Sequence, residues 1–155
     1  MTTIAWDGVT LAADCRTTES GSVYRVGTKI VRIPGGFVAC CGETVKIQTF
    51  LSWARKGGRG KSPLVEGIGA VLVKHDDVYW VEEGTLIQIP RVEKIATGSG
   101  WRWARAAMDF GCNAVEAVAY ASLRDCYTGG GVDFVRPFGA TQVRLSPKSK
   151  RVSRS

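Results

Sequence analysis

Hydroxyl side chains are poor nucleophiles at neutral pH, and each needs a base before it can attack a carbonyl. The chain contains one histidine, His75, so a Ser-His-Asp triad would have to use it. His75 stands with Asp76 and Asp77 between two predicted strands, where an exposed hairpin turn is expected. We therefore interpret His75 as a turn residue rather than as the base of a triad.

The N-terminus offers another base, namely a free α-amino group on the residue that carries the hydroxyl. The chain begins Met1-Thr2-Thr3, and methionine is commonly removed when a small residue such as threonine follows it. Its removal would expose the amine and the hydroxyl of Thr2 together. An α-amino group has an unperturbed pKa of about 7.7–8.0, which is close to the working pH. Thr2 is therefore a candidate nucleophile, although many ordinary proteins also begin in this way.

The net charge of +7 is concentrated in two short segments. Outside them the chain is close to neutral, and local basicity of this kind does not by itself describe a nucleic-acid-binding domain. We expect nucleic acid not to be a partner, and a non-enzymatic assembly or nucleic-acid-associated protein that uses both segments is an alternative. The basic residues are Arg55, Lys56, Arg59 and Lys61 in one segment, and Lys148, Lys150, Arg151 and Arg154 in the other.

The cysteines lack the spacing of a metal site or of a disulfide scaffold. There are five, an odd number, and none forms a CxxC pair. We expect buried reduced thiols, with no metal and no cofactor. No apolar run approaches the roughly 20 residues of a membrane span, and the N-terminus lacks the layout of a secretory signal. A soluble cytoplasmic protein without a membrane partner is the expectation.

Hydrophobic patterning and turn residues predict strands, a helix, more strands, two helices and closing strands. Two sheets with helices outside them would bury the apolar faces, although composition does not select this layout over other α+β arrangements. We expect one domain over residues 1–145 and a disordered basic tail over residues 146–155. Predicted strands cover residues 2–7, 9–13, 29–33, 37–41, 69–74, 78–82, 93–97, 132–135 and 141–145, and predicted helices cover residues 43–55, 100–110 and 113–125.

Each predicted helix has one apolar face and a recognisable start. Asn113 followed by Glu116 is typical of a capping box at the start of the third helix. Trp101 and Trp103 lie two residues apart and point to different sides of the second helix, so at least one is expected to be exposed. The predicted inward faces are Ile47, Phe50, Leu51 and Ala54 in the first helix, Trp101, Ala104, Ala107 and Met108 in the second, and Val115, Val118, Ala119 and Ser122 in the third.

Five short motifs occur in order along residues 2–135. They are Thr2-Thr3-Ile4-Ala5 with Leu11-Ala12-Ala13-Asp14-Cys15-Arg16, Lys29 at the start of a strand, Cys41-Gly42 before the first helix, Thr97-Gly98-Ser99-Gly100, and Arg124-Asp125-Cys126-Tyr127-Thr128-Gly129-Gly130. Together they resemble the motifs of proteasome beta-type and HslV-type N-terminal threonine peptidases. Two positions depart from that pattern: Cys41 stands where the family has glycine, and Thr128 stands where it has serine.

The resemblance implies a fold and a set of roles. The fold would be the α+β, four-layer αββα sandwich of N-terminal nucleophile hydrolases. Thr2 would be the nucleophile after removal of Met1, and Lys29, held by Asp14, would favour the free-base form of its amine. Ser99, Asp125 and Thr128 would complete the polar network around that amine. A backbone N–H at Cys41-Gly42 would stabilise the oxyanion.

Each of these residues also has a structural interpretation. Asp14 and Lys29 could form a salt bridge without a catalytic role, Ser99 could cap a helix, and Asp125 with Thr128 could end one. The resemblance further implies a polypeptide substrate, a homo-oligomeric ring and an ATP-dependent unfoldase as a candidate partner. Two alternatives stay open, namely a hydrolase of small-molecule amides and a catalytically silent assembly protein with the same fold.

Overall fold

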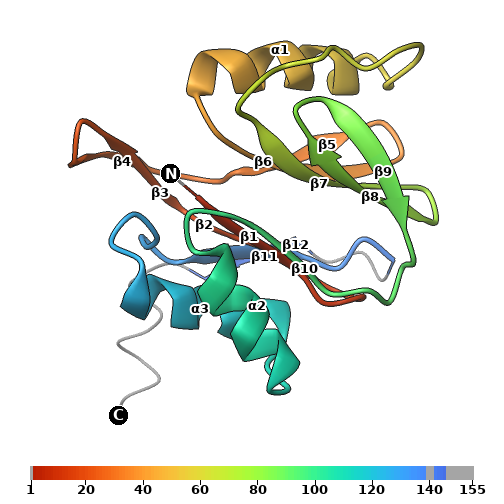
Figure 1. The fold of residues 1–155 in the computed structure, drawn as a ribbon. Coiled ribbons are helices and arrows are strands. Elements are labelled where there is room, and N and C mark those ends of the chain that lie inside the picture. The colour runs from red at the N-terminus through yellow and green to blue at the C-terminus, as the bar shows by residue number, and fades with distance from the viewer. Residues whose placement is uncertain (1, 139–141, 146–155) are drawn as a thin grey trace.

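The computed structural model describes residues 2–138 and 142–145, and those ranges contain twelve strands and three helices. Figure 1 shows two sheets stacked on each other, with α1 beyond one and α2 and α3 beyond the other. The elements are β1 (Thr3–Trp6), β2 (Leu11–Asp14), β3 (Arg16–Glu19), β4 (Ser22–Val26), β5 (Ile30–Ile33), β6 (Gly36–Cys41), α1 (Thr44–Arg55), β7 (Gly69–Lys74), β8 (Asp77–Glu82), β9 (Thr85–Ile89), β10 (Ile95–Gly98), α2 (Trp101–Asp109), α3 (Ala114–Arg124), β11 (Val132–Val135) and β12 (Gln142–Leu145).

The first sheet has the strand order β10-β1-β2-β11-β12, and its neighbouring strands are antiparallel. The tight turn between β1 and β2 forms at Asp7-Gly8, where Gly8 has a φ of 98° that favours glycine. Thr3 pairs with Gly98 of β10, and Asp14 at the end of β2 pairs with Val132 of β11. The start of β1 therefore lies between the ends of β10 and β2.

The second sheet has the order β5-β6-β7-β8-β9 and is also antiparallel. Its central strands β6 and β7 are buried over most of their length, as the apolar run before Gly42 predicts. A separate two-stranded sheet, β3–β4, forms a hairpin that projects beyond the two larger sheets at the left of Figure 1. Lys29 lies between that hairpin and β5.

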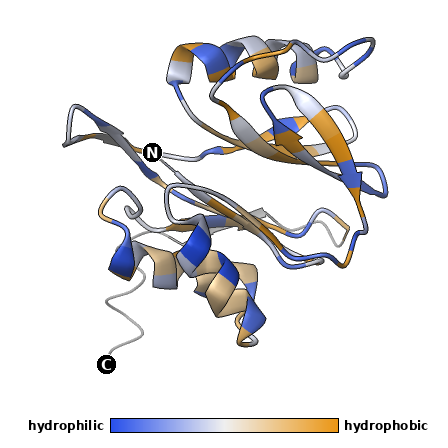
Figure 2. Ribbon diagram, in the orientation of Figure 1, coloured by the Kyte–Doolittle hydropathy of each residue, from blue (hydrophilic) through white to orange (hydrophobic). Residues whose placement is uncertain are grey.

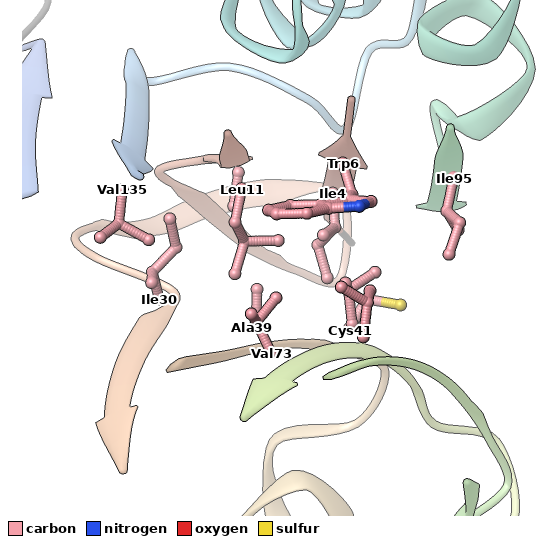
Figure 3. Close-up of a cluster of buried hydrophobic side chains, with 12 residues drawn as sticks. Ile4, Trp6, Leu11, Ile30, Ala39, Cys41, Val73, Ile95 and Val135 are labelled. Atoms are coloured by element: carbon pink, nitrogen blue, oxygen red, sulfur yellow. The ribbon is translucent and has the colours of Figure 1, made fainter. Parts of the chain in front are cut away.

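Three hydrophobic clusters hold these elements together. One fills the space between the sheets and includes Ile4 and Trp6 of β1 with Ala39, Cys41 and Val73 of the second sheet (Figure 3). A second joins α1 to the second sheet, and a third joins α2 and α3 to the first. Figure 2 shows hydrophobic residues along the strands of both sheets, whereas hydrophilic segments alternate along the helices.

The expected four-layer αββα sandwich is wrong as a description of this chain. The structure is mostly antiparallel sheet, with twelve strands against three helices in the described residues, and one of its sheets is the separate β3–β4 hairpin. Only α1 packs on the second sheet, and the residues that follow it, 56–68, form turns and loops instead of a second helix. Gly57, Gly58 and Gly60 have positive φ, so the chain cannot continue as a helix there.

Several predicted elements are confirmed and others need correction. In α1, Phe50, Leu51 and Ala54 are buried as predicted. The capping box at Asn113 and Glu116 is present. The prediction missed the strands β3, β4 and β9. The four residues of β3 are polar and mostly half-buried, and those of β9 are half-buried or exposed, so neither strand shows a clear hydrophobic alternation. The disordered tail predicted for residues 146–155 lies outside the described residues.

The inward faces of α2 and α3 were predicted only in part. In α2 the buried residues are Ala104, Ala107 and Met108, while Trp101 is 45% exposed. The predicted face of α3 is rotated, because the structure buries Ala114, Ala117, Val118 and Ala121. Alanines let the helix approach the sheet closely, so they occupy the contact in place of the larger side chains that patterning favours.

Candidate active site

Four segments distant in sequence converge on the N-terminal end of β1. They are the end of β2 with Asp14, Lys29 before β5, the turn at Gly98-Ser99-Gly100 between β10 and α2, and the loop after α3 that begins at Asp125. The pairing of β1 with both β10 and β2 fixes this convergence. The structure therefore brings all six predicted side chains, those of Thr2, Asp14, Lys29, Ser99, Asp125 and Thr128, to one end of the first sheet.

Thr2 lies immediately before β1 and is 6% exposed. Its carbonyl accepts a hydrogen bond of 2.8 Å from the backbone N–H of Ser99. It lines a cleft of about 650 Å³, which it shares with Lys29, Gly42 and Glu43. Side chains alternate along an extended strand, so the side chain of Thr3 points away from that cleft. Of the two N-terminal threonines, Thr2 is the one that lines the cleft with Lys29.

The glycines of the Gly98-Ser99-Gly100 turn allow this close approach. A Cβ on Gly98 would lie 1.7 Å from the carbonyl oxygen of Thr2, and its φ of 95° also favours glycine. A Cβ on Gly100 would lie 2.3 Å from Oγ1 of Thr3. Both glycines are therefore required by contact with the N-terminal strand, which gives the motif a physical reason at this position.

Asp14 is fully buried and forms the first polar cluster of the site. Its Oδ1 accepts hydrogen bonds of 2.9 Å from Nζ of Lys29 and from the backbone N–H of Thr3. Its Oδ2 accepts a hydrogen bond of 3.0 Å from the N–H of Gly129. Lys29 also donates to the carbonyl of Arg16. These charge-assisted bonds hold the lysine at a fixed position on the edge of the cleft.

Burial of the Lys29 ammonium disfavours its charge and lowers the pKa of that group below its ordinary value, although Asp14 acts in the opposite direction. The side chain of Lys29 is only 10% exposed. A lysine with a lowered pKa at the edge of a cleft is typical of functional sites, but burial lowers the pKa of a structural lysine in the same direction. The cleft that Lys29 shares with Thr2 is the observation that favours the functional interpretation.

Asp125 accepts the hydrogen bonds of a second polar cluster. Its Oδ2 accepts hydrogen bonds from the hydroxyls of Ser99, at 2.5 Å, and Thr128, at 2.6 Å, and its Oδ1 accepts one of 3.3 Å from the N–H of Tyr127. Partial burial opposes ionisation of Asp125, but these donors outweigh it and the pKa of the carboxyl is lowered. Ser99 does not cap α2, whose N-cap is Gly100, so that structural alternative is excluded.

Cys41 and Gly42, the expected oxyanion position, lie at the turn between β6 and α1. The backbone of Gly42 has a φ of 126° and lines the same cleft as Thr2. The side chain of Cys41 points into the core between the sheets (Figure 3), where its thiol lies 3.3 Å from the carbonyl oxygen of Gly69. Cysteine in place of glycine therefore leaves the cleft side of this turn open, while Cys40 lines the cleft.

The expectation of buried thiols holds for three cysteines and is wrong for two. Cys15, Cys40 and Cys41 are buried, Cys112 is half-buried and Cys126 is exposed, and all five are reduced thiols. Cys126 lies in the loop after α3, where the chain turns at the surface. Burial raises the pKa of Cys41 above its ordinary value. This keeps its thiol neutral beside Lys29, and a neutral thiol is a poor nucleophile.

Sequence reasoning missed Thr3, which takes part in both polar clusters. Its N–H bonds Asp14, its Oγ1 lies 2.6 Å from Oγ1 of Thr128, and it accepts a hydrogen bond of 3.1 Å from the N–H of Gly100. Thr3 is completely buried. Two adjacent threonines at the start of a strand predict that one faces each side, and that alternation is the signal that could have identified it.

No protein-family model matches the chain, and no curated protein sequence matches it either. Among the described residues no helix is both long and apolar enough to cross a lipid bilayer. The case for an activity therefore depends on the geometry around Thr2 and on the resemblance of the five motifs.

Proposed function

We propose that this protein is an N-terminal threonine hydrolase that cleaves peptide bonds, with Thr2 as the nucleophile once Met1 has been removed. One observation carries the proposal: Thr2 lines a cleft together with Lys29, whose ammonium is held by the fully buried Asp14. The second cluster, around Asp125 and Ser99, supports it, because the backbone N–H of Ser99 donates a hydrogen bond to the carbonyl of Thr2.

In the first step, Oγ1 of Thr2 attacks the carbonyl carbon of the scissile amide. The free α-amine of Thr2 takes the hydroxyl proton, directly or through a water molecule, and a C–O bond forms. The tetrahedral intermediate collapses when the C–N bond breaks and the proton passes to the leaving amine. An ester between Thr2 and the acyl part of the substrate remains, and water then hydrolyses it to a carboxylic acid and regenerates the hydroxyl.

Lys29 and Asp14 support this step electrostatically. A positive charge near the α-amine disfavours the protonated amine and favours the oxyanion form of the nucleophile. Asp14 holds that charge in place, and the side chain of Lys29 is largely shielded from water. The Gly42 turn, on the same cleft, is the candidate source of a backbone N–H for the oxyanion of the intermediate.

A polypeptide is the substrate that we propose, because the five motifs resemble those of peptidases; the cleft of about 650 Å³ has room for a short segment of peptide, and its volume also suits a small molecule. A hydrolase of small-molecule amides and a catalytically silent assembly protein are the competing functions. A catalytically silent protein would not need both polar clusters near Thr2 with all their hydrogen bonds formed, and this favours an enzyme.

We also propose that the protein works as a homo-oligomeric ring in the cytoplasm, with an ATP-dependent unfoldase as a candidate partner. The ring is supported by Trp101 and Trp103, which are 45% and 43% exposed on one helix, because tryptophan is enriched at protein interfaces. Five reduced thiols are consistent with a reducing compartment.

The test combines mass spectrometry with kinetics. Intact mass of the purified protein should lack Met1, and a threonine-directed electrophile should modify Thr2 and stop cleavage of peptide substrates. Thr2→Ala should abolish hydrolysis without loss of folding. The control Thr10→Val changes a buried threonine outside the site and should retain hydrolytic activity. Full activity in the Thr2→Ala protein would overturn the proposal, and cleavage of small amides but not of peptides would favour the first competing function.

A further inference from the structure

We infer that Thr3 is a positioning residue of this site, one that ties the two polar clusters together and so sets the place of Thr2. The inference rests on the proposed function, because it concerns the residue next to the proposed nucleophile. Thr3 is fully buried and does not line the cleft, so it is not itself a group that touches substrate.

The hydrogen bonds around the hydroxyl of Thr3 have one direction. The hydroxyl of Thr128 has one proton and donates it to Oδ2 of Asp125. In the 2.6 Å contact between the two threonine hydroxyls, Thr128 must then accept, and Thr3 must donate. The N–H of Gly100 donates to Thr3 in turn. The donors and acceptors therefore form one directed chain from Gly100 through Thr3 and Thr128 to Asp125.

The backbone of Thr3 is bonded to the other polar cluster. The N–H of Thr3 donates to Oδ1 of Asp14, the oxygen that also accepts from Lys29. Thr3 is thus bonded by its main chain to the first polar cluster, that of Asp14 and Lys29. Its side chain is bonded to the second polar cluster, that of Asp125, Ser99 and Thr128. Thr2 is joined to it by a peptide bond, so a shift of Thr3 moves the nucleophile with respect to both clusters.

Removal of the Thr3 hydroxyl would break the hydrogen bonds on both sides of it. In Thr3→Val the shape of the side chain is kept, but the N–H of Gly100 loses its acceptor and Thr128 loses a donor. A buried donor without a partner favours rearrangement of the turn that also holds Ser99. A displacement of about 1 Å at a reacting group can lower a rate by about 100-fold. We therefore expect the loss to fall on kcat and not on KM.

The experiment compares Thr3→Val, Thr3→Ser and the control Thr10→Val in full-length protein, with intact mass to verify removal of Met1 in each. We expect Thr3→Val to lower kcat by about tenfold to 100-fold at unchanged KM, and to slow modification of Thr2 by the electrophile in parallel. Thr3→Ser keeps the hydroxyl and should restore kcat to within about twofold of wild type. Thr10→Val should leave both constants unchanged.

Three results would overturn the inference while leaving the proposed function intact. They are wild-type kcat in Thr3→Val, an equal loss in Thr3→Ser, and an equal loss in Thr10→Val, each measured while activity still depends on Thr2. If Thr2 does not react in wild-type protein, the proposed function fails and the inference falls with it. Should Thr3→Val not fold, Thr3→Cys replaces it, because its thiol is a weak donor; wild-type kcat in that variant would count against the hydroxyl.

Discussion

The hydroxyl oxygens of Thr3 and Thr128 lie 2.6 Å apart although 125 positions separate them in the chain. This contact joins the first strand to the loop after α3, and both residues are at most 1% exposed. A hydrogen bond between two buried hydroxyls fixes the position of each more firmly than an exposed contact does. The candidate nucleophile is therefore attached to a rigid part of the molecule.

Lys29→Ala should remove activity as severely as Thr2→Ala does. Acid–base assistance is worth roughly 10²–10⁴ in rate, and the two residues act on the same proton transfer. Residues that act as a unit have losses that do not add, so the double variant should be no less active than either single one. Steady-state kinetics on a peptide substrate measures this. Lys46→Ala is the control, since Lys46 is an exposed lysine on α1. A Lys29→Ala enzyme within about tenfold of wild type would assign Lys29 a structural role.

Lys29→Met should also lower the free energy of unfolding, by about 3–5 kcal/mol, because it leaves the charge of the fully buried Asp14 without its partner. The matched substitution Lys46→Met breaks the exposed pair with Glu43, at 3.5 Å, and should change the free energy of unfolding by less than about 1 kcal/mol. Urea denaturation of both variants at neutral pH measures the difference. Equal midpoints would show that the Asp14 pair contributes little to stability.

Asp125→Asn should reduce the dependence of stability on acidic pH. The pKa of Asp125 is lowered from 3.8, so the folded protein binds that proton less readily than the unfolded chain does. Its contribution to stability is present above the unfolded pKa and is lost as pH falls through the folded value. Removing the carboxylate should therefore shrink the fall in unfolding free energy as pH drops from about 5 through the unfolded value of 3.8 and below it. Urea titrations at several pH values measure it, with Asp109→Asn, at an exposed pair with Arg105, as control. An unchanged pH dependence in Asp125→Asn would contradict the assignment.

Native mass spectrometry should find a closed ring of this chain at micromolar concentration. A head-to-tail contact that repeats with closing rotation generates such a ring. Replacing Trp101 and Trp103 by serine together should shift the protein toward monomer, because both side chains are exposed on α2 in the single chain. Leu123→Ser, at an exposed apolar residue on α3, controls for a general change in surface polarity. A wild-type monomer with full peptidase activity would refute the ring.

Local features of the sequence were enough to predict part of this protein. The period of apolar residues in α1 predicts its buried face, and Asn113 with Glu116 predicts the start of α3. Both signals act over one or two helical turns, so they need no knowledge of the rest of the chain. The residues of the candidate site were identified in another way, by the resemblance of five motifs, in type and order, to those of a peptidase family.

The tertiary structure alone decided the remaining features. The face that α3 buries and the projecting hairpin β3–β4 depend on contacts between distant segments. The same holds for the partners of Thr3, because strand alternation predicts only that Thr2 and Thr3 face opposite sides. Its partners Gly100 and Thr128 lie 97 and 125 positions away, and only the folded chain brings their hydrogen-bonding groups to one place.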